Sequence, residues 1–109
     1  MSAKPTALGY LRRDVSGMTQ PWDESRMRGL AKRLGYELTR IVIVGPGNDD
    51  PETQLVKLAR NSDVDAVLVP SAEHFGGDIP AVLVRVCDVI TVSPETTYAR
   101  WAWSATGEG

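Results

Sequence analysis

Two groups of polar residues that could do chemistry follow two apolar runs of the sequence. Arg12 and Asp14 come directly after the run at 7–11, and Glu73 and His74 follow the run at 64–69. Ligands of open α/β sheets bind outside the carboxyl ends of the strands, so we expect both groups at one edge of a sheet. Two carboxylates and an imidazole are ligands that a divalent cation accepts. Their spacing matches no metal-ligand motif, however, and we predict neither a metal nor a cofactor here.

The elements that must position these residues alternate between strands and helices. Apolar runs, several of them rich in β-branched residues, predict four strands, at 7–11, 36–44, 64–69 and 88–92. Helical spacing of apolar residues and capping residues predict four helices, at 22–34, 51–61, 79–86 and from 93 to about 103. Clusters of glycine, proline and small polar residues predict loops at 16–21, 45–49 and 71–78.

This alternation predicts an α/β fold. Strands that are apolar on both faces are typical of a parallel sheet covered by helices on each side, so we expect a three-layer sandwich with a small, mainly parallel four-stranded sheet. The 109 residues are enough for one hydrophobic core. We therefore expect a single domain over 1–109, with frayed ends at about 1–5 and 105–109.

The charge balance argues against a dedicated nucleic-acid-binding protein. The formal net charge is −2, whereas such proteins usually carry a basic face or stripe. Six basic residues fall between positions 12 and 33, in the first third of the chain: Arg12, Arg13, Arg26, Arg28, Lys32 and Arg33. Their simplest interpretation is a solvated helix face, so DNA is not the favoured partner.

Composition also predicts the cellular setting. No apolar run approaches the roughly 18 residues that would suggest a membrane span, and the first residues do not have the pattern of a signal peptide. The single cysteine, Cys87, lies within an apolar run, which is typical of a small buried hydrophobe. We expect a cytoplasmic protein that has no contact with a membrane.

Several local motifs resemble the catalytic domain of the serine recombinases, the resolvase/invertase family. That family opens with Tyr-x-Arg-x-Ser, and residues 10–14 here read Tyr-Leu-Arg-Arg-Asp. A helix that ends in Gly-Tyr is matched at 35–36, and an Asp-led apolar strand is matched at 65–69. The loop that follows reads Leu-Asp-Arg-Leu-x-Arg in the family and Ala-Glu-His-Phe-Gly-Gly at 72–77 here. The resemblance covers roughly residues 7–101 and implies a resolvase-like fold.

The departures from these motifs imply that the recombinase chemistry is lost. The family uses a serine nucleophile and several arginines that neutralise charge on the phosphate. Arg12 is retained, but Asp14 stands at the serine position, and His74 and Gly77 stand where the loop arginines are expected. The nearest hydroxyl, on Ser16, is two residues out of register. We expect no catalytic residues, only a vestigial recombinase site made of Tyr10, Arg12, Asp14, Glu73 and His74.

Aromatic residues suggest how such a domain could still function. Trp22, Tyr98, Trp101 and Trp103 either pack against the sheet or form an interaction surface, since aromatic residues are enriched at contact cores. The favoured hypothesis is a pseudoenzyme that acts through protein–protein contacts, as a homodimer or with an unidentified protein partner. One alternative is a DNA-binding accessory protein derived from a recombinase. Another is a small-ligand or nucleotide-binding domain that uses the strand ends near Arg12, Asp14 and His74.

Overall fold

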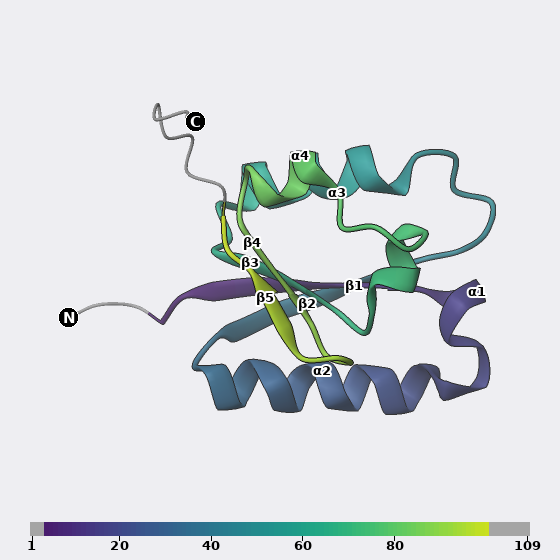
Figure 1. Cartoon of the computed structure of the whole chain (residues 1–109), viewed down its shortest axis with the longest axis horizontal. Helices are drawn as coiled ribbons and strands as arrows, with labels where there is room; N and C mark the ends of the chain where they lie inside the picture. Colours follow the sequence, from purple (N-terminus) through teal and green to yellow (C-terminus); the bar gives the residue numbers. More distant parts are fainter. Residues whose placement is uncertain (1–3, 101–109) are drawn as a thin grey trace.

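The computed structural model describes residues 4–100, which form a five-stranded sheet between two layers of helices (Figure 1). The strands are β1 (Thr6–Arg12), β2 (Glu37–Val44), β3 (Ala66–Val69), β4 (Asp88–Thr91) and β5 (Thr96–Tyr98). The helical segments are α1 (Arg13–Ser16), η1 (Gly17–Thr19), α2 (Gln20–Leu34), α3 (Pro51–Ser62), η2 (Ala72–Phe75) and α4 (Ala81–Val84). The sheet order is β2-β1-β3-β4-β5, with β1 to β4 parallel and β5 antiparallel to β4. The predicted α/β class and mainly parallel sheet are confirmed.

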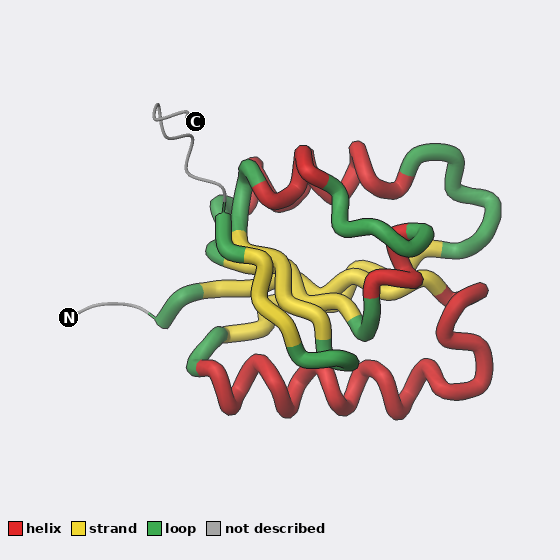
Figure 2. The backbone as a smooth tube through the Cα atoms, in the orientation of Figure 1, coloured by secondary structure: helices red, strands yellow, loops and turns green. Residues whose placement is uncertain are grey.

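Helices cover both faces of the sheet, which explains the uninterrupted apolar runs. Helix α2 lies on one face, and α3 and α4 lie on the other, so that the strands form the middle layer of the tube in Figure 2. Every residue of β3 is buried, as are the five central residues of β1. The core divides into a cluster on the α3 side, which includes Leu8 and Leu55, and a cluster on the α2 side, which includes Leu30 and Leu68.

Helix α2 packs closely on β1 because of a glycine in the strand. A Cβ atom placed on Gly9 would lie 2.8 Å from Cε of Met27 and 2.9 Å from Cγ1 of Ile41. The helix has Pro21 in its first turn and ends at Gly35, whose φ of 85° is readily adopted only by glycine. The sequence therefore sets both the ends of α2 and how near it comes to the sheet.

The connections around β1 create a crevice at one edge of the sheet. The chain leaves β1, passes through α2 on one face and returns as β2 on one side of β1. It then passes through α3 on the other face and returns as β3 on the opposite side of β1. The change of direction between β1 and β3 opens a crevice at the carboxyl ends of these two strands, where α/β proteins bind ligands.

The final helix predicted from residue 93 is wrong. Residues 92–95 instead form a turn with a cis peptide bond before Pro94, and the chain returns along β4 as β5. The Thr91 hydroxyl donates a hydrogen bond to the carbonyl of Pro94 inside this turn. The β-branched and aromatic residues of β5 suit a pleated strand, and β4 supplies partners for their backbone groups. The sheet consequently has five strands rather than four.

Three other predicted boundaries differ from the structure. The segment 16–21 is not a loop, because Ser16 ends α1, η1 follows, and α2 begins at Gln20. The predicted loop at 71–78 contains η2, and the helix predicted at 79–86 is only the single turn α4. Helical segments of three or four residues are too short to show an apolar period in the sequence, so pattern reasoning does not find them.

Candidate functional site

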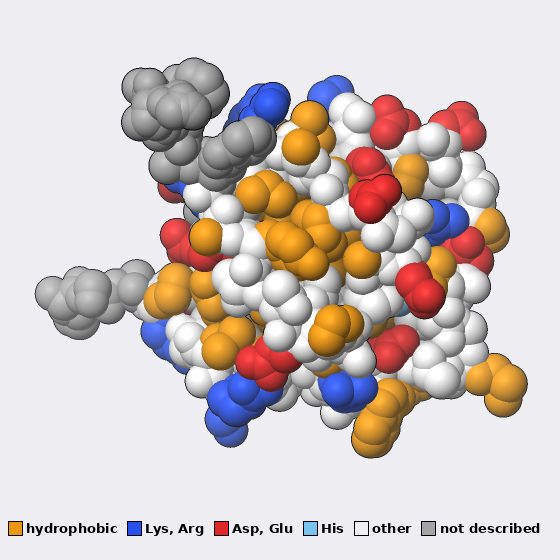
Figure 3. Space-filling view, viewed as in Figure 1, with side chains coloured by type: hydrophobic (Ala, Val, Ile, Leu, Met, Phe, Trp, Pro, Cys, Tyr) orange, Lys and Arg blue, Asp and Glu red, His pale blue; other side chains and the backbone are white. Residues whose placement is uncertain are grey.

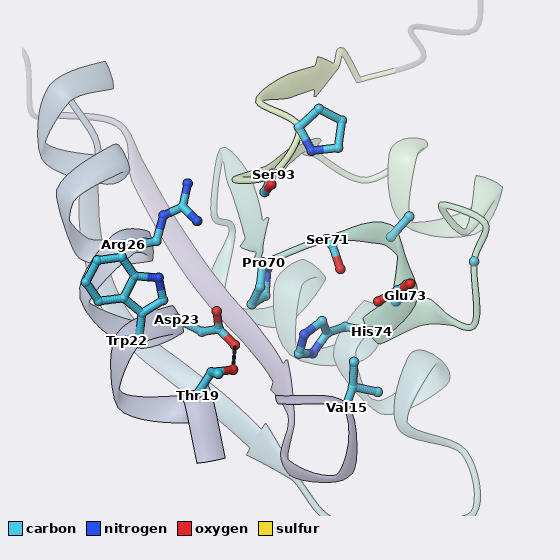
Figure 4. A pocket seen from close by; sticks show the side chains of 13 residues that line it. Val15, Thr19, Trp22, Asp23, Arg26, Pro70, Ser71, Glu73, His74 and Ser93 are labelled. Carbon is cyan, nitrogen blue, oxygen red and sulfur yellow. Dashed lines mark hydrogen bonds between the residues drawn. The ribbon is translucent and has the colours of Figure 1, made fainter. Parts of the chain in front are cut away.

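An open cleft of about 560 Å³ lies at the carboxyl ends of β1, β3 and β4. One wall is α2, which contributes Trp22 and Arg26, and the opposite wall is the segment after β3, which contributes Ser71, Glu73 and His74 (Figure 4). The other lining residues are Val15, Thr19, Asp23, Pro70, Ala72, Gly77, Ser93 and Pro94. The cleft offers an aromatic face, one cation, several hydroxyl groups and the carboxylates of Asp23 and Glu73, so its lining holds more acidic than basic side chains.

Arg12 and Asp14 form an ion pair beside this cleft. Nη2 of Arg12 lies 2.8 Å from Oδ2 of Asp14, and Nε of Arg12 lies 3.3 Å from Oδ1. The hydrogen bond from the Arg12 guanidinium holds the pKa of the Asp14 carboxyl below its usual value. The carboxylate therefore stays charged at neutral pH and compensates the only motif arginine that the sequence retains.

His74 is a buried structural residue rather than an exposed loop residue. Only 3% of its surface is accessible, and its Nδ1 accepts a hydrogen bond of 2.9 Å from the backbone N–H of Arg12. This bond requires Nδ1 without a proton, and burial lowers the pKa of His74 below 6.5. The imidazole is consequently neutral at pH 7 and ties η2 to the end of β1.

Tyr10 and Glu73, the other two residues of the predicted vestigial site, lie apart from Arg12, Asp14 and His74. Tyr10 is fully buried and stacks on Phe75 with ring centroids 5.0 Å apart, and burial raises the pKa of its hydroxyl to about 12. Glu73 is exposed and lines the cleft. The structure therefore joins Arg12, Asp14 and His74, leaves Glu73 on the cleft wall, and places Tyr10 in the core.

The hydroxyl of Ser16 is hydrogen-bonded to the carboxylate of Asp23, a contact that the sequence did not predict. It donates a hydrogen bond of 2.7 Å to Oδ2 of Asp23, and the Thr19 hydroxyl lies 3.2 Å from the same oxygen. Only 7% of Ser16 is accessible, and it does not line the cleft. The spacing of Ser16 and Thr19, seven and four residues before Asp23, would have indicated this contact if η1 and α1 had been recognised as helical.

Arg26 is another cleft residue that the sequence reasoning did not assign to a site. It lies four residues after Trp22, so both side chains project from the same face of α2. Within residues 4–100 it takes part in no ion pair. The four-residue spacing of an aromatic and a cation was the signal available in the sequence. Among those same described residues, His, Cys, Asp and Glu side chains form no group of three that could hold a metal ion.

Comparison with known proteins identifies the fold. No protein-family model matches the chain, and no curated protein matches it in sequence. A solved structure, the resolvase family site-specific recombinase from Streptococcus pneumoniae, superposes with a TM-score of 0.68 at 16% sequence identity. The match covers 86% of this chain and 76% of that chain. This chain has a resolvase-like fold.

The resolvase-like fold places the predicted aromatic surface in two separate regions. Trp22 lines the cleft and is 64% exposed, and Met18, four residues earlier in η1, is almost fully exposed. Tyr98 is 40% exposed on β5 and lines an apolar hollow of about 520 Å³ with Ile79 and Val84. Hydrophobic side chains gather on this face of the molecule, between β5 and α4 (Figure 3). The other two tryptophans, Trp101 and Trp103, lie outside the described residues.

The longest helix of the described residues is α2, with 15 residues. Between residues 4 and 100, no helix has both the length and the apolar character needed to cross a bilayer.

Proposed function

We propose that this chain is a non-catalytic resolvase-like domain that acts through contacts with other proteins. The observation that carries the proposal is the ion pair between Arg12 and Asp14. Phosphoryl transfer by the family that the sequence resembles needs a hydroxyl nucleophile and unpaired cations directed at the phosphate. At the serine position of that motif, this chain has a carboxylate that repels a phosphate and compensates the remaining arginine.

The other groups near the strand ends support the same proposal. His74 holds no charge at neutral pH, and its Nδ1 is used by the backbone of Arg12. The Ser16 hydroxyl is directed at Asp23 and is buried away from the cleft. Neither a free nucleophile nor a set of converging cations remains among Arg12, Asp14, Ser16 and His74.

Exposed apolar side chains support the protein-contact role. Met18 and Trp22 project at the corner between η1 and α2, and Tyr98 borders the apolar hollow beside β5. Tryptophan and tyrosine are frequent anchors of protein interfaces because each buries a large surface at a small cost in conformational entropy. Exposed apolar patches of this kind usually mark interaction sites.

The catalytic half of the proposal is tested with the natural chain and the Asp14→Ser variant. Both are incubated with supercoiled plasmids that carry genomic fragments of the encoding organism, and the products are examined for nicks and covalent protein–DNA adducts. We expect neither product, because Asp14→Ser restores a hydroxyl but not the arginines that correspond to His74 and Gly77. Nicking or an adduct with either protein would refute the non-catalytic role.

The contact half is tested by capturing proteins from the encoding organism on the immobilised chain. The comparison is a Met18→Ser/Trp22→Ser double variant, whose circular dichroism spectrum shows whether it is folded. Both side chains are exposed, so we expect an intact fold and at least about a tenfold loss of the captured proteins. Identical capture by the natural chain and the variant would exclude this corner as the contact surface.

A further inference from the structure

Strand β2 leaves one edge of the sheet open. It is the longest strand, with eight residues, and β1 is its only hydrogen-bonding neighbour among the described segments. The opposite edge is β5, which has only three residues. An open edge exposes a row of unpaired N–H and C=O groups that are complementary to another extended strand.

The second half of β2 lacks the features that usually protect such an edge. Residues 41–44 read Ile-Val-Ile-Val without charge or proline, and Ile43 is 41% exposed. Leu38, Ile41 and Ile43 line a groove of about 340 Å³ between β2 and α2, together with the polar residues Glu24, Arg28, Thr39 and Arg40. Natural edge strands are commonly charged or interrupted. In β2 the charge of Arg40 and the irregularity after Leu38 lie before residues 41–44, which are uncharged and regular.

The side chains of this segment alternate between the two faces of the sheet. Val42 and Val44 belong to the core on the α3 side. Ile41 faces α2, because both Ile41 and Met27 approach the space above Gly9. Ile43 must share the α2 side with Ile41, since successive side chains of a strand point to opposite faces.

We propose that two copies of this chain pair through antiparallel β2 strands, with a two-fold axis at Val42. The proposal rests on the proposed protein-contact function and names a second copy as the partner. In this register Ile41 of each copy faces Ile43 of the other on the α2 side, and Arg40 faces Val44 on the α3 side. Opposed residues of an antiparallel pair lie on the same face, so this register matches Ile41 with Ile43 and the two Val42 side chains with each other. The pairing is self-complementary, as a two-fold interface requires.

Repulsion between the Arg40 side chains and the length of regular β2 backbone both favour this register. An axis at Arg40 would set two guanidinium groups directly opposite each other, which is unfavourable. With the axis at Val42, the two Arg40 residues are separated by four positions, or about 13 Å along the strands, beyond the Debye length of about 10 Å at 0.1 M salt. The irregularity between Leu38 and Arg40 and the proline at 46 limit regular pairing to 40–44. The axis at Val42 is the one that uses this whole segment.

The size of the interface determines how it must be measured. Five residues of each copy form a contact smaller than the roughly 1,200 Å² typical of stable complexes, so the dimer is expected to be concentration-dependent. Light scattering coupled to size-exclusion chromatography, carried up to about millimolar protein, covers the range of such weak contacts.

The first test compares Ile43→Lys with the matched control Val82→Lys. Val82 is 51% exposed on α4, which packs on α3 and β4, so both variants add one charge at an exposed apolar residue. We expect the natural chain and Val82→Lys to dimerise and Ile43→Lys to raise the dissociation constant at least about tenfold. A natural chain that is monomeric at every concentration would overturn the proposal, as would a dimer that Ile43→Lys leaves unchanged.

The second test reports the register. A Val42→Cys variant places two thiols on the proposed axis, within the separation of Cα atoms that a disulfide allows. Cys87 is 1% exposed and does not compete. We expect a covalent dimer under mild oxidation for Val42→Cys and only monomer for a Val82→Cys control. If the Val82→Cys protein forms a covalent dimer and the Val42→Cys protein does not, the proposed β2 interface is wrong. The DNA and capture experiments above do not involve β2, so failure here is distinct from failure of the proposed function.

Discussion

At the scale of single residues, the strand ends show polar groups that satisfy one another. Asp14 accepts from the Arg12 guanidinium, and His74 accepts from the backbone N–H of the same arginine. The Ser16 hydroxyl donates to Asp23, which lines the cleft from α2. In the sequence these residues suggest a reactive centre. In the structure their hydrogen bonds connect η2 to the end of β1, and α1 to α2.

The buried imidazole predicts a dependence of stability on pH. Because burial lowers the pKa of His74 in the folded protein, the unfolded chain binds its proton at higher pH than the folded chain. The contribution of His74 to stability is therefore complete above pH 6.5, and it declines as pH falls below 6.5 towards the folded-state pKa. We expect the free energy of unfolding to fall in this window by up to about 1.4 kcal/mol per pH unit, the limit for one proton. Urea unfolding at a series of pH values measures this slope.

His74→Asn is the matched control for that measurement. The asparagine Oδ1 can accept the hydrogen bond from the Arg12 backbone, but the side chain does not titrate. The variant should therefore lose the part of the slope that belongs to His74. A slope that is equal in both proteins would assign the pH dependence to other groups.

At the scale of elements, the closest contact is the one between β1 and α2. Gly9 allows Met27 of α2 and Ile41 of β2 to approach the strand where any side chain would meet them. The helix is further linked to the turn after β4 by the ion pair of Arg33 with Glu95, whose N–O distance is 2.9 Å. Both groups of that pair are well exposed, so the packing at Gly9 matters more for the position of α2.

Adding one methyl group at this contact tests its importance. We expect Gly9→Ala to lower the free energy of unfolding by about 1–3 kcal/mol, because Met27 and Ile41 must move away from the new Cβ. Gly29→Ala is the control, since Gly29 lies within α2 with no atom within 4 Å of an added Cβ. It should be neutral or stabilise by up to about 1 kcal/mol through helix propensity. Equal effects in the two variants, measured by chemical denaturation, would contradict the close approach of β1 and α2.

At the scale of the whole molecule, the three layers enclose the single thiol. Cys87 lies in the core cluster on the α3 side, and burial raises its pKa to about 12. Both the lack of access and the low thiolate fraction protect it from thiol reagents in the folded state. Its reactivity therefore reports the opening of the core.

Thiol labelling of the natural chain should depend on unfolding. At pH 8 we expect a disulfide reagent to react with Cys87 more than about a hundredfold more slowly in the folded protein than in urea. The exposed thiol of Val82→Cys provides the comparison for an accessible cysteine in the folded state. Similar rates for Cys87 with and without denaturant would show that the layers open locally around β4.

The local pattern of the sequence determined the order of the main strands and helices as far as β4, the mainly parallel class of the sheet and the burial of Cys87. It could do so because apolar periodicity, helix caps and helix-ending glycines act within a few residues, as at Gly35 and Asp50. The resemblance of residues 10–14 and 72–77 to recombinase motifs likewise indicated the fold that the structural comparison supports.

Tertiary structure alone decided which partner each segment and each polar group found. Residues 96–98 became a strand because β4 lay open beside them, and the propensity for a helix after Pro94 could not compete. His74 became buried because η2 turns it towards the amide of Arg12, which lies 62 residues away in sequence. The open edge of β2 also follows only from the sheet order. Each outcome depends on contacts between distant residues, and such contacts leave no periodic signal in the chain.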